Sequence, residues 1–472
     1  MRKILLVIFT ALLLITGCQN VNNKPKYIFL FIGDGMGLQQ VNATQVYLDS
    51  VLKNKQKLSF IDFPVQTFAT TYAATRYITC SAAAGTALST GNKTSISTIG
   101  LNYNHTDSLF SVAKKLKENG YKIGILTTVG IDDATPSAFY AHQGLRGSRY
   151  EIAKDLIKSG YDFFGSGGFF DPFGKKLKDS VESIYSIGLK KSFAFTTKLS
   201  SVDSLKNNYK SVFYSVPNAT SESSFKYVID SDSSDITLAQ MTQKAIETVY
   251  NPKGFFVMVE GGKIDWACHS NDAAAMIHEL IAFSDAVNQA VEFYKAHPNE
   301  TLIIVTADHE TGGFSLGNRE NKYNINLSVL KNQKVSKDQF QLLVKEKFSR
   351  NLKPSFKQML EFTKTLIGLG NDSLKLALND TDLKQLQQAY NESIKSDNSK
   401  KNTKSYLSGP NEKFSSTCID ILNRKAAIGW TSTAHTGSPV PVYVIGVGKE
   451  LFSGRLDNTD IPNIVSELTL SK

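Results

Sequence analysis

Cysteine is scarce in this sequence, with four residues in a chain of 472. They stand far apart, at Cys18, Cys80, Cys268 and Cys418. If Cys18 is modified, as its context below indicates, an odd number remains, which excludes the dense disulfide framework of small secreted domains. A composition of 41% hydrophobic and 20% charged residues instead fits a globular protein with a large buried core.

Long apolar runs are also scarce, and the one that stands out lies at the start of the chain. MRKILLVIFTALLLITGC combines a basic start, an apolar run over residues 4–15 and a small-residue box that ends in Cys18. This pattern predicts a lipoprotein signal peptide over residues 1–17, lipid on Cys18 and a tether over 18–26, with an ordinary secretory signal as the alternative. We therefore expect an exported protein, periplasmic or at the cell surface, that only lipid anchors to a membrane.

Clustered basic charge is missing too, although the formal net charge is +10. The lysines are spread along the chain and are only mildly concentrated between residues 331 and 404. Such a spread is typical of a solvated surface, so no nucleic-acid binding is predicted. The chain also shows no internal repeat of fixed period, which argues against a repeat fold.

Short apolar runs without polar alternation recur between helix-like segments, and they indicate strands. They cover residues 27–32, 122–126, 255–259, 302–305 and 440–445. Runs of this length, rich in Val, Ile and Phe, fit strands that are buried on both faces of a parallel sheet. We predict an α/β fold with a large, mostly parallel central sheet flanked by helices, in one catalytic domain over residues 27–472.

Residues 321–413 differ from the rest of this domain in texture. They carry lysine-rich amphipathic helix patterns and end in a polar, loop-like stretch, after which the strand pattern resumes. This arrangement predicts an inserted helical subdomain. Its patterns do not separate a dimer contact or a lid from surface decoration, so a homodimer remains open.

Acidic and histidine residues follow the predicted strands, at the positions where ligands bind in open α/β sheets. Taken singly they have ordinary explanations, since Gly33-Asp34-Gly35 is first of all a turn. Together, without a comparable set of Lys or Arg, they need a cation to offset their charge. Mixed His and Asp suit zinc and oxygen-only groups suit magnesium, so two zinc sites and a harder third site are expected. The candidates are Asp34, Thr135, Glu260, Asp265, His269, Asp308, His309 and His435, with Asp133 beside them.

The stretch RYITCSAAAGTALSTG, residues 76–91, places Ser81 at the head of a run of small residues with no histidine nearby. The run predicts a tightly packed helix whose N-terminus favours an anion. Ser81 could be only the N-cap of that helix. Beside a metal ion, however, the pKa of its hydroxyl would fall, and the serine would need no histidine to act as a nucleophile.

In their order and local spacing these residues resemble the alkaline phosphatase family, through the motifs at 33–37, 79–83, 133–136, 260–269, 306–309 and 435–438. The resemblance implies one zinc ion held by Asp265, His269 and His435, and a second held by Asp34, Asp308 and His309 with Ser81 close to it. It implies a magnesium ion on Asp34, Thr135 and Glu260, with Asp133 near through water. A phosphate-clamping arginine is implied at Arg146, with Arg149 as the alternative.

The activity that the resemblance implies is hydrolysis of phosphate monoesters to an alcohol and inorganic phosphate. It would run through a phosphoserine on Ser81, assisted by two zinc ions and one magnesium ion per chain. A phosphodiesterase on the same scaffold and a lipid-anchored phosphate-binding protein without turnover are the alternatives. A sulfatase is excluded because the Pro and Arg of the C/S-x-P-x-R motif are missing after Cys80, which we interpret as a small buried residue.

Two positions depart from the best known members of the family. Cys80 stands where they have an Asp that helps to hold the arginine, which predicts a less restrained Arg146 and weaker phosphate binding. Trp266 stands where they have Lys or His, which predicts that Asp133 lacks a nearby cationic partner. Neither change removes a metal ligand.

Overall fold

The structure is a computed structural model, and it describes residues 24–53, 56–175, 177, 180–349, 354–396 and 413–471. The predicted signal peptide, Cys18 and most of the tether lie outside these residues, as does the polar stretch 397–412. Within the described ranges, none of the helices combines the length and the apolar character needed to cross a membrane. The three cysteines in these ranges are free thiols, in agreement with the expected lack of a disulfide framework.

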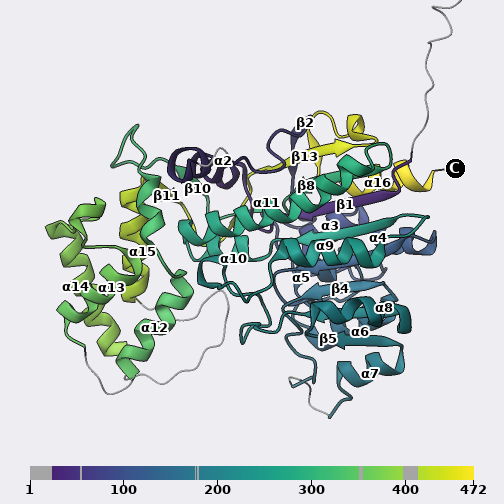
Figure 1. Cartoon of the computed structure of the whole chain (residues 1–472), viewed down its shortest axis with the longest axis horizontal. Coiled ribbons are helices and arrows are strands. Elements are labelled where there is room, and N and C mark those ends of the chain that lie inside the picture. The colour runs from purple at the N-terminus through teal and green to yellow at the C-terminus, as the bar shows by residue number, and fades with distance from the viewer. Residues whose placement is uncertain are drawn as a thin grey trace, which may run out of the picture.

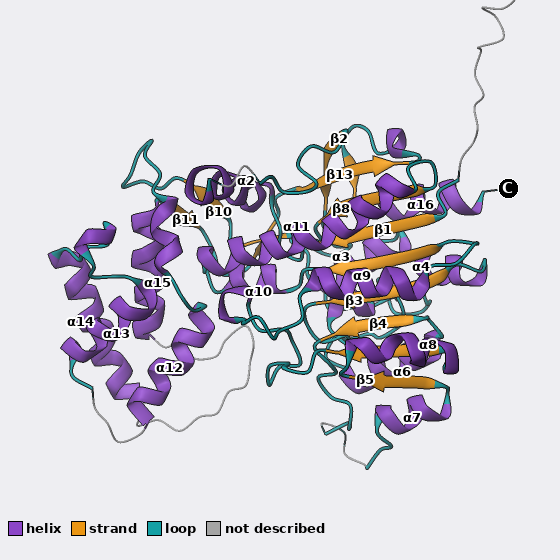
Figure 2. Cartoon of the chain, in the orientation of Figure 1, coloured by secondary structure: helices purple, strands orange, loops and turns teal. Residues whose placement is uncertain are grey.

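A ten-stranded sheet forms the centre of the molecule (Figures 1 and 2). All five apolar runs are strands of this sheet, which confirms the α/β fold. In spatial order the strands are β14 (Leu456–Asp457), β2 (Val65–Thr70), β13 (Val440–Gly446), β8 (Thr301–Thr306), β1 (Tyr27–Ile32), β7 (Phe255–Glu260), β3 (Lys122–Thr127), β4 (Phe163–Ser166), β6 (Ser211–Ser215) and β5 (Phe193–Thr196). Two small ladders join β9 (Glu310–Thr311) to β12 (His435–Thr436) and β10 (Phe314–Leu316) to β11 (Ile428–Trp430).

Helices cover both faces of the sheet. In Figure 1, α9 (Leu238–Val249) and α11 (Ala273–Ala296) lie in front of it, while α3 (Ser81–Thr90), α4 (Val112–Glu118) and α5 (Ala134–Ser137) lie behind. The remaining helices of the sheet domain are α2 (Leu38–Tyr47), α6 (Arg149–Ser159), α7 (Ile184–Lys190), α8 (Val202–Asn208), α10 (Lys263–His269) and α16 (Asp460–Leu470). With helices on both sides, the central strands are buried along their whole length, as in β1, β7 and β8.

The four central strands that precede the candidate ligands are direct neighbours, in the order β8, β1, β7 and β3. They run parallel, and their ends are level, because Ile32 pairs with both Thr306 and Glu260, and Glu260 pairs with Thr127. The residues that follow these strands therefore leave the sheet at one place. The sheet thus brings the loops of four distant segments to a single buried edge.

Strand β13 differs from the prediction of a parallel strand, because it runs antiparallel to both of its neighbours, β8 and β2. Its apolar pattern reports burial on both faces and carries no information on direction. The reversal decides where His435 lies. Since β13 begins at the edge where the parallel strands end, a histidine just before it reaches the same edge as the residues just after them.

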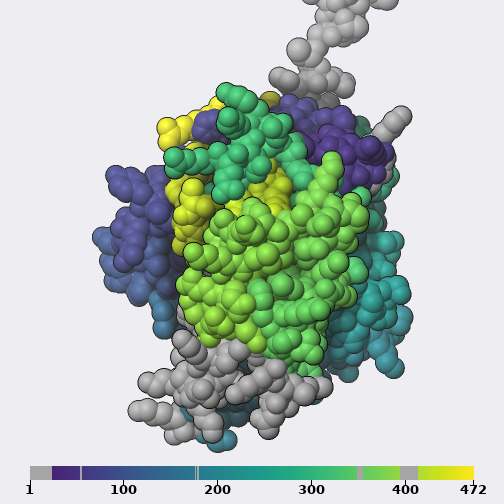
Figure 3. Space-filling view, turned by 90° about the vertical axis from the view of Figure 1, so that its left-hand side faces the viewer, coloured from purple at the N-terminus to yellow at the C-terminus, as the bar shows by residue number. Residues whose placement is uncertain are grey.

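The helical segment lies beyond this same edge. It contains α12 (Lys337–Ser349), α13 (Phe356–Ile367), α14 (Asp380–Ser396) and α15 (Lys413–Ala426), so its last helix extends past residue 413. In Figure 2 the parallel strands point towards α10 and this segment, and in Figure 3 its helices form the face turned to the viewer. The hydroxyl of Ser270, the residue after α10, donates to Asp338 of α12 at 3.1 Å, which ties the segment to that helix.

Gly35, in the loop after β1, shows how closely the segments at this edge approach one another. Its φ is +75°, which glycine adopts without strain, and a Cβ there would lie 2.8 Å from the Cα of Asp265 in α10. A side chain at this position would therefore push the β1 loop away from α10.

We expect Gly35→Ala to destabilise the metal-free protein by about 1–3 kcal/mol, because strained backbone and a backbone clash add up. Gly160→Ala is the matched control, since Gly160 also has a positive φ, +65°, but has nothing within 4 Å of its added Cβ. Urea unfolding midpoints of the two variants measure the difference. Equal losses would show that the approach of Asp265 contributes nothing.

Candidate metal centre and active site

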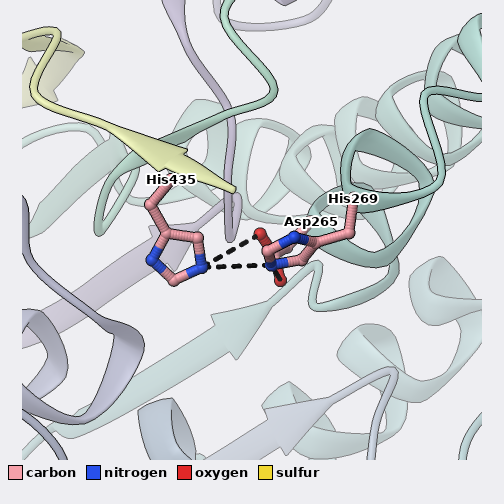
Figure 4. Close-up of side chains that lie close together, drawn as sticks. All are labelled: Asp265, His269 and His435. Carbon is pink, nitrogen blue, oxygen red and sulfur yellow. Dashed lines mark hydrogen bonds and ion pairs between the residues drawn. The ribbon is translucent and has the colours of Figure 1, made fainter. Parts of the chain in front are cut away.

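Three of the predicted ligands, Asp265, His269 and His435, form a first group (Figure 4). Asp265 and His269 lie one turn apart on α10, and His435 comes from β12. The Nε2 atom of His269 lies 3.2 Å from Asp265 Oδ2 and 3.1 Å from His435 Nε2, and His435 Nε2 lies 3.8 Å from Asp265 Oδ1. One ligand atom from each residue therefore faces a common point.

Backbone carbonyls determine which nitrogen of each histidine faces that point. His269 Nδ1 lies 2.6 Å from Thr433 O and His435 Nδ1 lies 3.1 Å from Thr79 O. A carbonyl oxygen only accepts, so in the neutral rings both Nδ1 atoms carry the proton and both Nε2 atoms present lone pairs. Two lone pairs 3.1 Å apart beside a carboxylate repel one another and fit a cation between them. In the metal-free protein a proton takes this place, because the charge of Asp265 outweighs burial and raises the pKa of His269 to about 9.

Asp34, Asp308 and His309 form a second group, and all three are buried. His309 Nε2 lies 3.5 Å from Asp34 Oδ1 and 3.3 Å from Asp308 Oδ2. These two carboxylate oxygens are buried without a hydrogen-bond partner. Unpaired buried oxygens of this kind are costly unless a cation binds them, so this group also fits a metal ion.

The electrostatics of the second group agree with this fit. Burial, and then the neighbouring carboxylates Asp308, Asp265 and Glu260, raise the pKa of Asp34 well above its ordinary value. Burial and the charge of Asp265 raise the pKa of Asp308 from 3.8 to about 7. Burial and the ring of His435 lower the pKa of His309, so it stays neutral and can act as a ligand.

The oxygen-only candidates lie on the other side of Asp34. The Thr135 hydroxyl donates to Asp34 Oδ2 at 3.5 Å, and the carboxylate of Glu260 accepts from Thr127. Burial raises the pKa of Glu260 to about 8. Asp34 therefore turns one oxygen to His309 and the other to Thr135, so it belongs to both the second group and the predicted harder site.

Ser81 is the first residue of α3 and is buried beside the second group. Its Oγ lies 3.3 Å from His309 Nε2, the atom that faces Asp34 and Asp308. The N-cap of the helix is Cys80, and no side chain caps it, so the alternative that Ser81 serves as the cap is wrong. The small residues of α3 allow close packing, since a Cβ on Gly85 would lie 3.2 Å from the Cα of Thr135.

Both candidate arginines bind the same carboxylate. Arg146 Nη2 and Arg149 Nη2 donate to Asp133 Oδ1 at 3.1 and 2.9 Å. Burial would raise the pKa of Asp133, but the charges of Arg149 and Arg146 hold it below its ordinary value. The prediction that Asp133 lacks a cationic partner is therefore wrong. The residue at position 266 does not reveal that Arg146 and Arg149, 13 and 16 residues after Asp133, fold back onto its carboxylate.

That Arg146 is less restrained than in family members with an Asp before the nucleophile stays a prediction, although Arg146 has partners of its own. Its guanidinium is held by Asp133, and its backbone N–H donates to Ser97 O at 2.7 Å. Cys80 takes part indirectly, since its Sγ accepts from Ser97 N at 3.2 Å. Arg149 is more fully occupied, because it also donates to the carbonyl of Asp132 and lies 4.4 Å over the ring of Phe170.

The family model described as alkaline phosphatase matches residues 25–161 and 219–470. The chain belongs to the alkaline phosphatase family. It is therefore a phosphatase, and its two ligand groups agree with the metal dependence of that family. The matched ranges include the helical segment and leave out residues 162–218, which carry β4, β5 and β6 at one end of the sheet.

Individual alkaline phosphatases extend the match to most of the chain. Alkaline phosphatase 4 of Bacillus subtilis is 32% identical over 455 residues, covering 94% of this chain and 88% of its own. The cold-active alkaline phosphatase of a psychrophilic Shewanella has 27% identity and a TM-score of 0.77, covering 94% of this chain and 100% of its own. That of Thermus thermophilus, at 23% identity and a TM-score of 0.74 over 97% of this chain and 95% of its own, has the same fold.

Sequence reasoning missed the residues that orient the ligands of this phosphatase. Thr79 and Thr433 act through backbone carbonyls, which no side-chain pattern can reveal. Lys263, the first residue of the helix that carries Asp265, was missed as well, and its buried ammonium lies 3.6 Å over the ring of Tyr227 and 4.6 Å over that of Trp266. Thr311, whose hydroxyl contacts two of the candidate ligands, could have been found from the sequence, because it follows His309 of the ligand motif by two residues.

Asp308→Asn should stabilise the metal-free protein at pH 8, because it removes one of several buried like charges while Oδ1 still accepts from Gly35 N and His309 N. The pKa of Asp308 rises from 3.8 when unfolded to about 7 when folded, so the wild type loses stability relative to the variant as pH rises through this interval. Thermal midpoints at pH 5 and pH 8 measure the gain, which should be clearly larger at pH 8 than at pH 5.

Zinc should reverse the order, so that the wild type melts above the variant once the metal is added. A variant that is less stable than the wild type at pH 8 without metal would contradict the account of repelling carboxylates.

Proposed function

We propose that this alkaline phosphatase hydrolyses phosphate monoesters to an alcohol and inorganic phosphate, with Ser81 as the nucleophile. The observation that carries the proposal is the position of Ser81 Oγ, 3.3 Å from the His309 nitrogen at which the second group converges. A serine at a helix N-terminus next to such a group has the setting that an alkoxide nucleophile requires.

The residues divide into those that would hold metal ions and those that would bind the substrate. Asp265, His269 and His435 would hold one zinc ion, Asp34, Asp308 and His309 a second, and Asp34, Thr135 and Glu260 a magnesium ion, with Asp133 near it. When bound, these ions would supply Lewis acidity that lowers the pKa of an oxygen and offsets the charge that builds up during phosphoryl transfer. The unpaired oxygens of Asp34 and Asp308 support this assignment.

In the first step, Ser81 Oγ attacks phosphorus in line with the ester oxygen, the bond from phosphorus to that oxygen breaks, and the alcohol leaves. Ser81 then carries the phosphoryl group as a phosphoserine. In the second step water attacks phosphorus, the bond to Ser81 Oγ breaks, and phosphate is released. Arg146 would bind the non-bridging oxygens in both steps, because a guanidinium matches a phosphoryl group in shape and charge.

The proposal also covers the setting of the enzyme. An exported lipoprotein with lipid on Cys18 would work on small phosphate esters outside the cytoplasm, attached to a membrane through its lipid. Since α12 contacts the residue after α10, we infer that the helical segment influences access of substrates to the first group. The homodimer that the sequence leaves open stays a prediction.

Ser81→Ala should lower turnover of an aryl phosphate monoester by about 10³-fold or more, because the nucleophile is lost, while zinc content stays unchanged. Ser89→Ala is the matched control. Ser89 lies in the same buried helix and donates only to backbone carbonyls, at 2.7 Å to Ala138 O and 3.2 Å to Thr86 O. Phosphate release after zinc and magnesium are returned to metal-stripped protein measures the effect.

Full activity in Ser81→Ala would refute the assignment of Ser81 as the nucleophile. Faster hydrolysis of an aryl diester than of the monoester by the wild type would favour a phosphodiesterase.

Arg146→Ala should raise KM for the monoester and the inhibition constant of phosphate by about 10–100-fold, because a hydrogen bond between charged groups is lost. Arg149→Ala should change both constants less. The side chain of Arg149 is 16% exposed and already binds Asp132 and Asp133, whereas that of Arg146 is 30% exposed and binds Asp133. Steady-state kinetics of the two variants compare them, and the opposite order would make Arg149 the clamp.

A further inference from the structure

Thr311 is the one buried side chain hydroxyl that bridges the two ligand groups among the described residues. It lies in β9, two residues after His309. Its Oγ1 donates to Asp265 Oδ1 of the first group and lies 3.2 Å from His309 Nδ1 of the second. Neither the hydroxyl nor its two partners are accessible enough to exchange these contacts for water, since all three residues are buried.

The backbone of Thr311 contacts the other ligand segments. Its N–H donates to Gly35 O at 3.2 Å, next to Asp34 in the loop after β1. In the β9–β12 ladder Thr311 pairs directly with His435. Its carbonyl accepts from Gln40 Nε2 at 3.1 Å. Every segment that supplies a ligand to either group therefore meets this one residue.

The hydroxyl also determines which nitrogen of His309 faces the second group. A hydroxyl has one proton, and the carboxylate of Asp265 can only accept it. The oxygen of Thr311 must then accept from His309, so the proton of the neutral ring lies on Nδ1. His309 Nε2 is left with a lone pair, aimed at Asp34, Asp308 and Ser81.

We propose that Thr311 is a positioning residue that serves both metal groups at once: its single hydroxyl orients Asp265 for the first group and selects the Nδ1–H tautomer of His309 for the second. This inference rests on the metal-binding role in the proposed function. Residues that hydrogen-bond metal ligands commonly change metal affinity by about 10–100-fold when they are replaced. A residue shared by two groups should show that loss at both.

Thr311→Val tests the inference, because valine has nearly the same shape and lacks the hydroxyl. Zinc dissociation constants are measured by competition with a chelator in two variant backgrounds. His269→Gln leaves the second group complete, and Asp308→Asn leaves the first group complete. We expect zinc to bind about 10–100-fold more weakly in both when Thr311→Val is added. Thr311→Ser keeps the hydroxyl, so in each background its zinc dissociation constant should stay within about 3-fold of the value without the substitution.

Thr306→Val is the matched control for losing a buried hydroxyl. Thr306 lies in β8 close to Asp308, and its hydroxyl bonds only to backbone carbonyls, those of Pro441 at 3.0 Å and Ala307 at 3.5 Å. It should cost some stability and leave both zinc constants unchanged. If Thr306→Val weakens zinc as much as Thr311→Val does, the effect belongs to the fold and the inference is overturned.

The tautomer of His309 supplies a second readout that does not depend on zinc. In the metal-free wild type, ¹⁵N NMR should show His309 protonated at Nδ1, with the signal assigned by its loss in His309→Gln. In Thr311→Val the signal should shift towards the Nε2–H form, and Thr311→Ser should restore it. An unchanged tautomer, or a loss of zinc affinity at one group alone, would overturn the inference. Failure of the wild type to bind zinc at all would refute the proposed function instead.

Discussion

Repulsion among buried carboxylates is the constraint around which this site is built. Asp34, Asp265, Asp308 and Glu260 reach one edge of the sheet from four different segments, and burial removes the water that would screen them. Their pKa values respond in different ways. Burial and neighbouring charges raise the pKa of Asp34, Asp308 and Glu260. At Asp265 the charge and hydrogen bond of protonated His269 outweigh burial and lower the pKa. The fold therefore places these acids where they either take up protons or bind a cation.

The protein pairs some of these acids with its own cations and leaves others for ligands. Asp133 is paired with two guanidiniums, although its charge still helps to raise the pKa of Glu260 after burial has done so. Asp34 and Asp308 each keep one buried oxygen without a partner, on the side that faces His309. This division separates the proposed phosphate-binding end of the site, with positive side chains, from the candidate metal-binding end, with lone pairs. Ser81, at the N-terminus of α3, lies beside the second of the two ligand groups.

The orientation of the ligands depends on groups outside the ligand motifs. Backbone carbonyls of Thr79 and Thr433 turn the two histidines of the first group, and the hydroxyl of Thr311 turns the histidine of the second. In each case the neutral ring keeps its proton on Nδ1, where an oxygen accepts it, and turns the lone pair of Nε2 towards the other residues of its ligand group. The helical segment adds a further contact, from Asp338 to Ser270, the residue after His269. Its position is therefore coupled to the helix that carries two ligands.

The sequence by itself determined the positions of β1, β3, β7, β8 and β13, the candidate ligands that adjoin them and the helix that begins at Ser81, because each depends on local composition. Continuous apolar runs mark buried strands, and the residues after them are read directly from the chain. The tertiary structure alone decided which strands are neighbours, that β13 runs antiparallel, and that Arg146 and Arg149 meet at Asp133. These features depend on packing between segments that are far apart in sequence. Thr311 and Asp265, 46 residues apart, share a hydrogen bond that no local pattern encodes, since it exists only once β9 and α10 are packed against each other.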